Sequence, residues 1–329
     1  MDVARAAGVS PMTASRALRG EQTVRSAAKE AVAAAVERLG YIPNQVAGSL
    51  RSRRSGIIAL ILPTLTGSVF GETIRGITDV LGEQDYQLMI GESSYDLERE
   101  EKVIAALMQR RPDGIIIAGV KHSAQARLML QATGAPVIEM WDQTTHPIDS
   151  VVGFSNRQAA YEFTDALISR GYRSFGLATG PLIAGNRAAL RAEGFHAALA
   201  THGLQPGPSI VVPYYDFLDR FLRGGELVAD FLDAQPQLDC LFCTNELIAI
   251  GSIVVCGRRN RRIPEDIAIV GFGDVEAASI INPPLSTVRI RGYRMGRTAA
   301  DLLLRRLTGA ATEPEIVDVG YEIVWRGSA

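Results

Sequence analysis

The chain has 329 residues, of which 47% are hydrophobic and 21% are charged, and this ordinary globular composition excludes a fibrous or wholly disordered protein. At roughly 100–200 residues per domain, the length predicts two or three domains. The apolar runs are far shorter than the roughly 20 residues of a membrane helix, and the start lacks a secretory signal core. Three cysteines suit a reducing compartment, so we expect a cytoplasmic protein without a disulfide framework or a membrane partner.

Charge is divided unevenly along the chain. Residues 1–54 hold nine Lys or Arg and four Asp or Glu, a net charge of +5, whereas the remainder holds 25 and 32, a net charge of −7. A small basic head on a larger acidic body is typical of a protein whose head binds a polyanion. Ordinary charge scatter is the alternative that composition leaves open.

The first 40 residues carry no strand pattern and predict three short helices, over residues 2–7, 11–19 and 26–39. Ser10 is expected to cap the second helix, and Pro11 suits its first position. Gly40 closes the third helix. Two short helices joined by a tight glycine-containing turn, and then a third, indicate a helix-turn-helix headpiece over residues 1–40. Residues 41–55 then predict a short hinge helix and a basic linker.

From Gly56 onward, apolar strands alternate with amphipathic helices. The expected strands are 57–62, 87–91, 114–119, 136–141, 150–154, 174–179, 209–214, 240–244, 267–272 and 315–324. The expected helices are 70–83, 97–110, 123–132, 156–170, 186–202, 217–233, 246–259 and 291–307. Continuous apolar strands separated by helices predict parallel sheets covered on both faces.

This body is too long for one such sheet, so the predicted fold class is α/β, with two doubly wound parallel lobes and a ligand cleft between them. We expect the first lobe to comprise residues 56–154 and about 288–313. The second lobe is expected to comprise residues 155–287 and about 314–329.

Motifs for catalysis or metal binding are missing from the sequence. It contains no GxGxxG after a strand, no GxxxxGK[ST], no GxSxG and no HExxH, so we expect no catalytic residue, no metal and no cofactor. Cys240 and Cys243 match CxxC, but residues three apart on a strand point to opposite faces, and core packing is expected. The four histidines lack ligand spacing and are expected at the surface or in loops: His122, His146, His196 and His202.

The headpiece and hinge match a known pattern. Residues 2–18 read DVARAAGVSPMTASRAL, residues 40–44 read GYIPN and residues 47–50 read AGSL. These segments resemble the LacI/GalR family of transcriptional repressors, and further matches lie at residues 63–77, 191–195, 244–246 and 283–288. Closer similarity to gluconate-operon repressors is indicated by residues 62–66, 151–156 and 242–245. The resemblance covers essentially the whole chain and implies a body of the periplasmic-binding-protein type.

The start of the second helix is the expected DNA-reading element. Arg16 can donate twice to guanine O6 and N7, and Met12 can contact a thymine methyl. The resemblance implies that operator preference is set by Pro11, Met12 and Arg16. Phosphate contacts, which fix register, are expected from Thr13, Ser15 and Asn44. A solvated charge on the helix face is the alternative for Arg16.

The hinge motif A-x-x-L places Ala47 and Leu50 at the predicted DNA-bending element. The resemblance implies that the matching leucine of each of two subunits wedges into the minor groove, unstacking a base step at a cost of about a few kcal/mol. Packing under the body is the alternative for Leu50.

Two features of the headpiece depart from the family pattern. Family members carry several residues before the Asp-Val-Ala, whereas Met1 alone precedes it here, so either the start lies upstream or the headpiece is weakened. The third helix lacks the usual serine cap and threonine, and we expect Arg25 and Lys29 to compensate by charge.

The resemblance also implies a set of ligand contacts in the cleft: Ser68, Val69, Phe70, Arg191, Asn245 and Asp274. The usual Gly-[Phe/Tyr]-Asp-[Asp/Asn] loop reads Gly-Phe-Gly-Asp at residues 271–274, so its first, ligand-facing aspartate is missing. With one negative charge fewer beside Arg191, a sugar acid such as gluconate is favoured over a neutral sugar. Glu139 and Asp142 are expected near the ligand's hydroxyl groups. A packing or loop role is the alternative for each contact.

The sequence thus predicts a repressor that binds a pseudo-palindromic operator as a homodimer and is controlled by a sugar or sugar acid between the lobes. A dimer is expected because the chain ends at Ala329 without the leucine heptad tail of tetrameric relatives. A periplasmic-type sugar-binding receptor is the alternative, against which the headpiece and the missing signal peptide argue. A sugar-acid dehydrogenase is a third possibility, disfavoured because no cofactor motif exists.

Overall fold

The computed structural model describes residues 2–18, 21–41, 54–66, 69–182, 186–213 and 217–329. They belong to two compact units, Met1–Ser55 and Gly56–Ala329. The hinge predictions at Asn44, Ala47 and Leu50, and the cleft prediction at Ser68, lie outside the described residues.

The first unit is the expected three-helix headpiece. Its helices are α1 (Asp2–Ala6), α2 (Pro11–Leu18) and α3 (Ser26–Leu39). Ser10 caps α2 as predicted, since its Oγ accepts from the Thr13 amide at 3.1 Å. Gly40 closes α3 in the left-handed conformation, with φ of 57°. Five small or β-branched residues form its buried core: Val3, Ala4, Ala14, Val32 and Ala35.

The first lobe of the body is built on a parallel sheet with the strand order β11-β5-β4-β3-β1-β2. Its strands are β1 (Ile57–Leu62), β2 (Gln87–Glu92), β3 (Gly114–Ala118), β4 (Val137–Met140), β5 (Ser150–Gly153) and β11 (Ile316–Asp318). Its helices are α5 (Gly71–Gly82), α6 (Leu97–Met108), α7 (Ala124–Ala132) and α13 (Gly292–Thr308).

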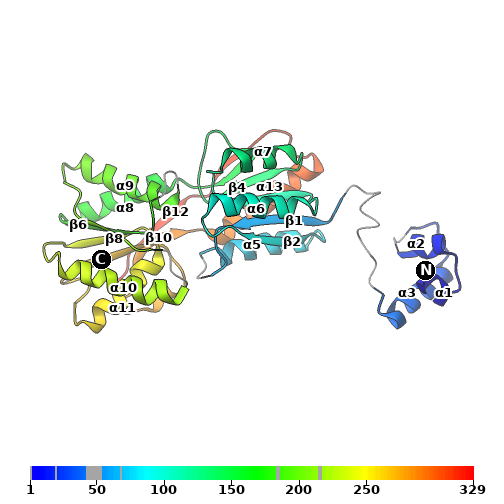
Figure 1. The fold of residues 1–329 in the computed structure, drawn as a ribbon, viewed down its shortest axis with the longest axis horizontal. Coiled ribbons are helices and arrows are strands. Elements are labelled where there is room, and N and C mark those ends of the chain that lie inside the picture. The colour runs from blue at the N-terminus through cyan, green and yellow to red at the C-terminus, as the bar shows by residue number, and fades with distance from the viewer. Residues whose placement is uncertain (1, 19–20, 42–53, 67–68, 183–185, 214–216) are drawn as a thin grey trace. The chain divides into compact units, whose positions relative to one another are not determined.

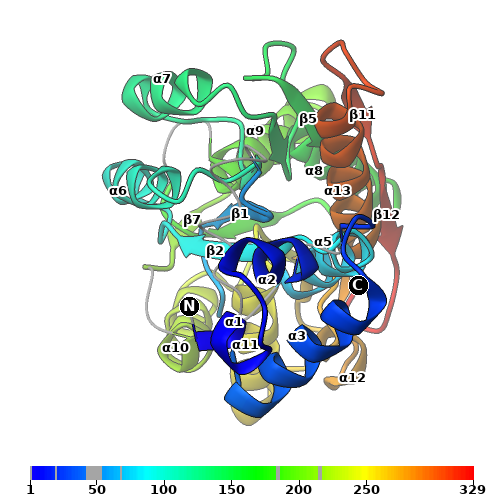
Figure 2. The same cartoon turned by 90° about the vertical axis from the view of Figure 1, so that its right-hand side faces the viewer.

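Alternate residues of β1 face opposite layers of this lobe. Leu60 packs in one core with α5 and α13, whereas Ile61 packs in another with α6 and α7. Helices α5 and α13 lie side by side (Figure 2) because two glycines remove the side chains between them. A Cβ on Gly296 would stand 2.1 Å from the Thr73 carbonyl oxygen, and one on Gly76 would stand 2.3 Å from that of Tyr293.

The second lobe has the strand order β12-β10-β9-β8-β6-β7, with β12 antiparallel to β10 and the other pairs parallel. Its strands are β6 (Phe175–Thr179), β7 (Ser209–Val211), β8 (Cys240–Cys243), β9 (Ala268–Gly273), β10 (Ser286–Ile290) and β12 (Tyr321–Val324). Its helices are α8 (Asn156–Ser169), α9 (Arg187–Thr201), α10 (Phe217–Asp233), α11 (Glu246–Arg258) and α12 (Ala277–Ile280).

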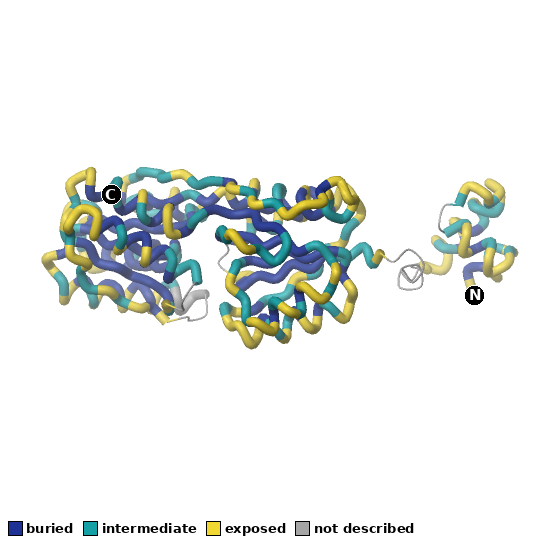
Figure 3. The backbone as a smooth tube through the Cα atoms, turned by 90° about the horizontal axis from the view of Figure 1, so that it is seen from above, coloured by how far each residue is buried: buried dark blue, intermediate teal, exposed yellow. Residues whose placement is uncertain are grey.

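In this lobe, α8 and α9 cover one face of the sheet, and α10 and α11 cover the other (Figure 1). Cys240 lies in the first core and Cys243 in the second, so the expectation that these thiols point to opposite faces is confirmed. In both lobes the strands carry the buried residues and the helices expose their outer faces (Figure 3). No helix of the described ranges combines the length and apolar character needed to cross a membrane.

Two lobe boundaries differ from the expected ones. Strand β10, which was not among the expected strands, pairs in the second sheet, although residues from about 288 were assigned to the first lobe. The single strand expected at 315–324 is two strands, β11 in the first sheet and β12 in the second. The break has a local cause: Gly320 adopts φ of 66°, and its amide donates to Asp318 Oδ1 at 2.8 Å. The chain therefore passes between the lobes three times, after β5, β10 and β11.

Candidate functional site

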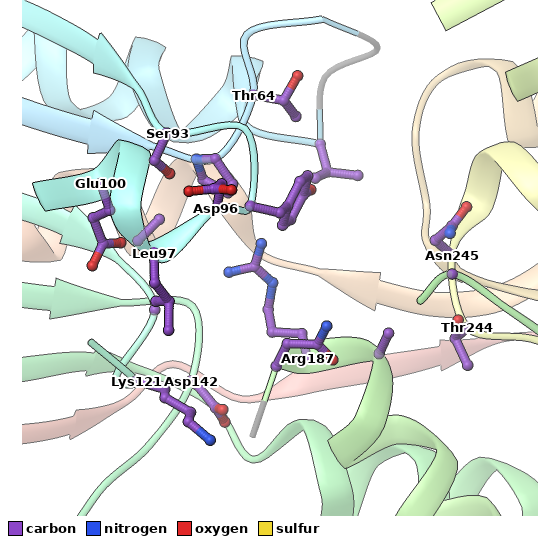
Figure 4. Close-up of a pocket in the computed structure, with 18 of the residues that line it drawn as sticks. Thr64, Ser93, Asp96, Leu97, Glu100, Lys121, Asp142, Arg187, Thr244 and Asn245 are labelled. Carbon is purple, nitrogen blue, oxygen red and sulfur yellow. The ribbon is translucent and has the colours of Figure 1, made fainter. Parts of the chain in front are cut away.

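A cavity of about 430 Å³ lies between the two lobes of the body, a size typical of small-molecule sites. Its walls come from segments that follow the carboxyl ends of strands, as expected for doubly wound sheets. The first lobe supplies Thr64 after β1, Ser93 after β2, Lys121 after β3 and Asp142 after β4, and Thr244 and Asn245 after β8 stand on the opposite wall (Figure 4).

Three of the predicted ligand contacts line this cavity: Val69, Arg191 and Asn245. Phe70 does not line it, because its side chain is fully buried and packs edge-on against Trp141 with ring centroids 4.7 Å apart. Asp274 does not line it either. Arg289 Nε and Arg326 Nη1 each lie 2.6 Å from its carboxylate, so this side chain is held in an ion-pair network of the second lobe.

Arg191 is fixed in place by three contacts. Its Nε donates to Asn156 Oδ1 at 2.9 Å, its Nη1 donates to the Thr244 carbonyl at 2.8 Å, and its guanidinium stacks 3.9 Å from the Phe272 ring centroid. Among the described residues, no carboxylate lies within ion-pair distance of it. Burial and the neighbouring Arg187 lower the pKa of Arg191 to about 9, so the side chain is still charged at neutral pH. Arg191 is therefore a positively charged hydrogen-bond donor that the fold holds in a position suited to binding an anion.

Arg187 is a cavity residue that the sequence reasoning missed. It lies four residues before Arg191 on α9, and this spacing places both side chains on one helix face. Its guanidinium reaches into the middle of the cavity (Figure 4), 5.4–5.9 Å from the rings of Phe70, Tyr95 and Trp141. The four-residue spacing from a predicted ligand arginine was the signal that could have found it.

The carboxyl groups nearest to these arginines are shifted toward the neutral form. Burial, reinforced by the charge of Asp274, raises the pKa of Glu246 to about 8. Burial also raises the pKa of Asp142, although hydrogen bonds with Gln143 and Asn156 and the charge of Arg187 act in the opposite direction. The positive charge of the arginine pair is therefore incompletely balanced within the cavity.

A second group of charges extends from Glu100, which lines the cavity on the first-lobe wall, into the core behind it. His122 lies in a loop, one of the two placements expected, but its side chain is 1% exposed, with Nδ1 2.7 Å from Glu100 Oε1 and Nε2 3.5 Å from Glu139 Oε1. Burial lowers its pKa, but hydrogen bonds and charge from both glutamates prevail and raise the value to about 9. Glu139 is fully buried and accepts from the Ile148 amide at 2.6 Å, so it does not line the cavity as expected, whereas Asp142 does.

In the headpiece, most of the predicted α2 residues share an exposed face. Pro11, Met12, Ser15 and Arg16 are exposed, and Met12 retains 64% of its accessible surface. Among the described residues, the one ionic contact of Arg16 is with Glu21 at 3.7 Å, a weak surface pair. Thr13 differs, because its hydroxyl lies 2.8 Å from Ser10 Oγ at the helix cap. Helix α2 thus presents an apolar and basic surface to solvent.

Comparisons with known proteins cover both units. Residues 55–321 match the model of periplasmic binding proteins and the sugar binding domain of the LacI family, and residues 1–44 match that of bacterial regulatory proteins, lacI family. The chain is 34% identical to the HTH-type transcriptional regulator GntR of Escherichia coli K12, over 99% of this chain and 97% of that one. It is 32% identical to IdnR of the same organism, over 98% and 96%.

Solved structures agree with these matches. A LacI-family transcriptional regulator from Silicibacter pomeroyi superposes with a TM-score of 0.91 at 35% identity, over 99% of this chain and 98% of that one. The complex of the transcriptional regulator CelR with cellobiose superposes with a TM-score of 0.70 at 26% identity, over 100% and 98%.

Proposed function

The chain belongs to the LacI family of bacterial regulatory proteins and is a DNA-binding transcriptional repressor, and we propose that its effector is a sugar acid such as gluconate. The match of residues 1–44 to a DNA-binding regulator model sets aside the alternative of a receptor without DNA function. The related CelR was solved with cellobiose, a neutral sugar. The proposal for this chain rests on two arginines in the second-lobe wall of the cavity.

The observation that carries the proposal is the arginine pair on α9. Arg191 has two of its three guanidinium nitrogens engaged by Asn156 and Thr244, and Nη2 is left for a ligand among the described residues. Arg187 enters the same cavity with aromatic rings as its neighbours and no carboxylate within ion-pair distance in the described chain. A ligand carboxylate supplies the partner that both lack, and buried charge-assisted hydrogen bonds of this kind are about twice as strong as neutral ones.

The first-lobe wall of the cavity, which faces α9, suits hydroxyl groups. Thr64 and Ser93 offer hydroxyls there, and Asp96, Glu98 and Glu100 offer acceptor oxygens. A polyhydroxylated chain with one terminal carboxylate satisfies both walls when its acid end faces α9. A ligand with a second anion at the far end would meet these carboxylates and be repelled.

The test is calorimetric titration of the full-length protein with gluconate and with glucose, the matching aldose, which lacks the acid group and closes to a ring. We expect saturable binding of gluconate and at least about thirtyfold weaker binding of glucose, since loss of a buried ion partner costs roughly 2–5 kcal/mol. Glucarate, which adds a second carboxylate, should bind more weakly than gluconate. Equal affinities for glucose and gluconate would contradict the proposal.

On DNA, we propose that the repressor acts in the cytoplasm as a homodimer on a pseudo-palindromic operator. The exposed positions of Pro11, Met12 and Arg16 on α2 support base contacts in the major groove. We propose that Thr13, Ser15 and Asn44 contact DNA phosphates. Leu50, beside Ala47, is proposed as the minor-groove wedge. Operator fragments with one and two half-sites, compared by gel shift, test the dimer.

A further inference from the structure

The loop that lacks its ligand-facing aspartate is covered by another carboxyl group. A Cβ built on Gly273 would lie 3.3 Å from Glu246 Oε2 and 3.3 Å from Val69 Cγ1, and one built on Gly271 would lie 3.0 Å from the same Glu246 oxygen. Gly273 also adopts φ of 148°, which strains any other residue. The Glu246 side chain therefore occupies the space beside position 273, reached from the start of α11 instead of from the loop.

Glu246 is held at one oxygen and unpartnered at the other. Its Oε2 accepts from the Thr287 hydroxyl at 3.0 Å, while its Oε1 is buried without a hydrogen-bond partner among the described residues. The residue is 1% exposed and lines the cavity together with Arg191. An ionised oxygen left in this position would carry a large desolvation penalty, whereas a protonated one becomes a hydrogen-bond donor.

Among the described residues, three charged or titratable groups surround Glu246, each from a different element. The carboxylate of Asp274, after β9, disfavours the ionised form of Glu246, and Arg191 of α9 favours it. The charge of Glu246 in turn disfavours ionisation of the Cys243 thiol of β8. Val69 and Thr287 bring no charge. Burial and the charge of the Asp274 carboxylate prevail over the hydrogen bonds from the Thr287 hydroxyl and the Asp274 backbone and over the charge of Arg191, so the pKa of Glu246 rises to about 8.

We propose that Glu246 is a specificity-determining residue of the effector cleft, an uncharged carboxyl group in the cavity wall that leaves the charge of Arg191 available to the effector's carboxylate. This inference rests on the proposed sugar-acid effector. An ionised aspartate at position 273 would accept hydrogen bonds from a neutral sugar and repel an acid. A neutral Glu246 does not repel an acid, so a glycine at position 273 with the Glu246 side chain beside it favours acids over neutral sugars.

The inference predicts a pH dependence with a defined sign. A sugar acid with an ordinary carboxyl pKa near about 4 is an anion throughout the range from pH 6.5 to 9. Glu246 is protonated at the lower end and loses its proton as the pH rises through about 8. At pH 9 only about a tenth of the protein keeps Glu246 uncharged and about half keeps Arg191 charged, so gluconate affinity should fall at least about tenfold between pH 7 and pH 9, with proton uptake on binding at the higher pH.

Calorimetric titration with gluconate at pH 6.5, 7, 8 and 9 tests this in the wild-type protein and two variants. Glu246→Gln is uncharged at every pH, so its affinity should stay within about threefold of the wild type at pH 7 and fall by only about twofold to pH 9, the part expected from Arg191. Thr287→Val removes the hydroxyl that stabilises the ionised form, so the fall in affinity should move to higher pH. Glu193→Gln, on the exposed face of α9, is the matched control and should follow the wild type.

Three results would overturn the inference. The first is a wild-type affinity that does not change with pH. The second is an equal fall in wild type and Glu246→Gln, which would assign the titration to another group such as Arg191. The third is an unmoved midpoint in a folded Thr287→Val protein. Failure of gluconate to bind at any pH would instead refute the sugar-acid effector itself, so the two proposals fail in different ways.

Discussion

The headpiece and the body place their functional residues in opposite environments. The predicted DNA contacts on α2 are exposed and project from a core of five small or β-branched residues. The cavity arginine Arg191 and Glu246 are almost fully buried and are held by neighbours on other strands and helices. The exposed residues of α2 gain their function only when DNA binds them, whereas the buried cavity residues bind an effector because the fold leaves their charge without a partner. Changes in the two regions should therefore separate DNA binding from effector response.

The largest expected effect is on effector response, from Arg191→Ala. Removing the guanidinium strands the effector carboxylate in a desolvated cavity, which should cost roughly 2–5 kcal/mol and abolish measurable gluconate binding. Operator affinity without effector should remain within about threefold, because the headpiece is unchanged. Fluorescence anisotropy on operator DNA, with and without gluconate, measures both quantities. Arg157→Ala, at an exposed position of α8, is the control and should retain effector release. Retained binding in Arg191→Ala would mean that Arg191 is a packing residue.

A substitution that crowds two packed helices of the body without altering charge should lower the stability of the body. Gly296→Ala places a methyl group 2.1 Å from the Thr73 carbonyl oxygen, so α13 and α5 must move apart. We expect a loss of about 1–3 kcal/mol in the free energy of unfolding, as for other overpacked cores. Gly82→Ala, at the last residue of α5, meets nothing within 4 Å and should be neutral or stabilising by up to about 1 kcal/mol. Urea denaturation of both variants gives the comparison, and equal stability would show that the close helix approach is not required.

Base readout is predicted to depend on one exposed side chain of the headpiece. Arg16→Ala should weaken binding to the cognate operator by about 1–3 kcal/mol while leaving non-specific DNA affinity nearly intact. Its only ionic contact in the described chain is the weak pair with Glu21, so the fold should not suffer. Filter binding to operator and to unrelated DNA at one salt concentration separates the two affinities. An equal loss on both DNAs would make Arg16 a phosphate contact.

The two regions also differ in how far the sequence predicts them. The headpiece depends on local signals, so the bounds of α3, the Ser10 cap and the Gly40 terminus are all confirmed. In the body, local periodicity predicted most strands and helices but missed β10, and it did not predict which lobe β10 and β11 join, since sheet membership is decided by distant partners.

The cavity shows the same limit. Arg191 and Asn245 follow from the family pattern and line the cavity, whereas Arg187, Glu246 and the buried His122 acquire their roles from residues far along the chain. The prediction that Asp274 lines the cavity was wrong because its ion-pair partners, Arg289 and Arg326, lie 15 and 52 residues further along the sequence and give no local signal.

The smallest expected effect tests whether the headpiece's thin core makes its caps matter. Ser10→Ala removes the acceptor for the Thr13 amide at the start of α2 and should destabilise the headpiece by about 1 kcal/mol. Because five residues form the core, this is a large share of what a unit of this size can have. Hydrogen exchange of the α2 amides in the full-length protein measures it, and DNA should restore protection by binding only the folded headpiece. Ser123→Ala, at the equivalent cap of α7 in the body, loses a matching bond at 3.0 Å but also a contact with Glu101, and exchange in distant body helices should stay unchanged. If Ser10→Ala leaves α2 exchange unaltered, local capping does not limit the headpiece, and its marginal stability must be sought in the packing of Val3 and Val32 instead.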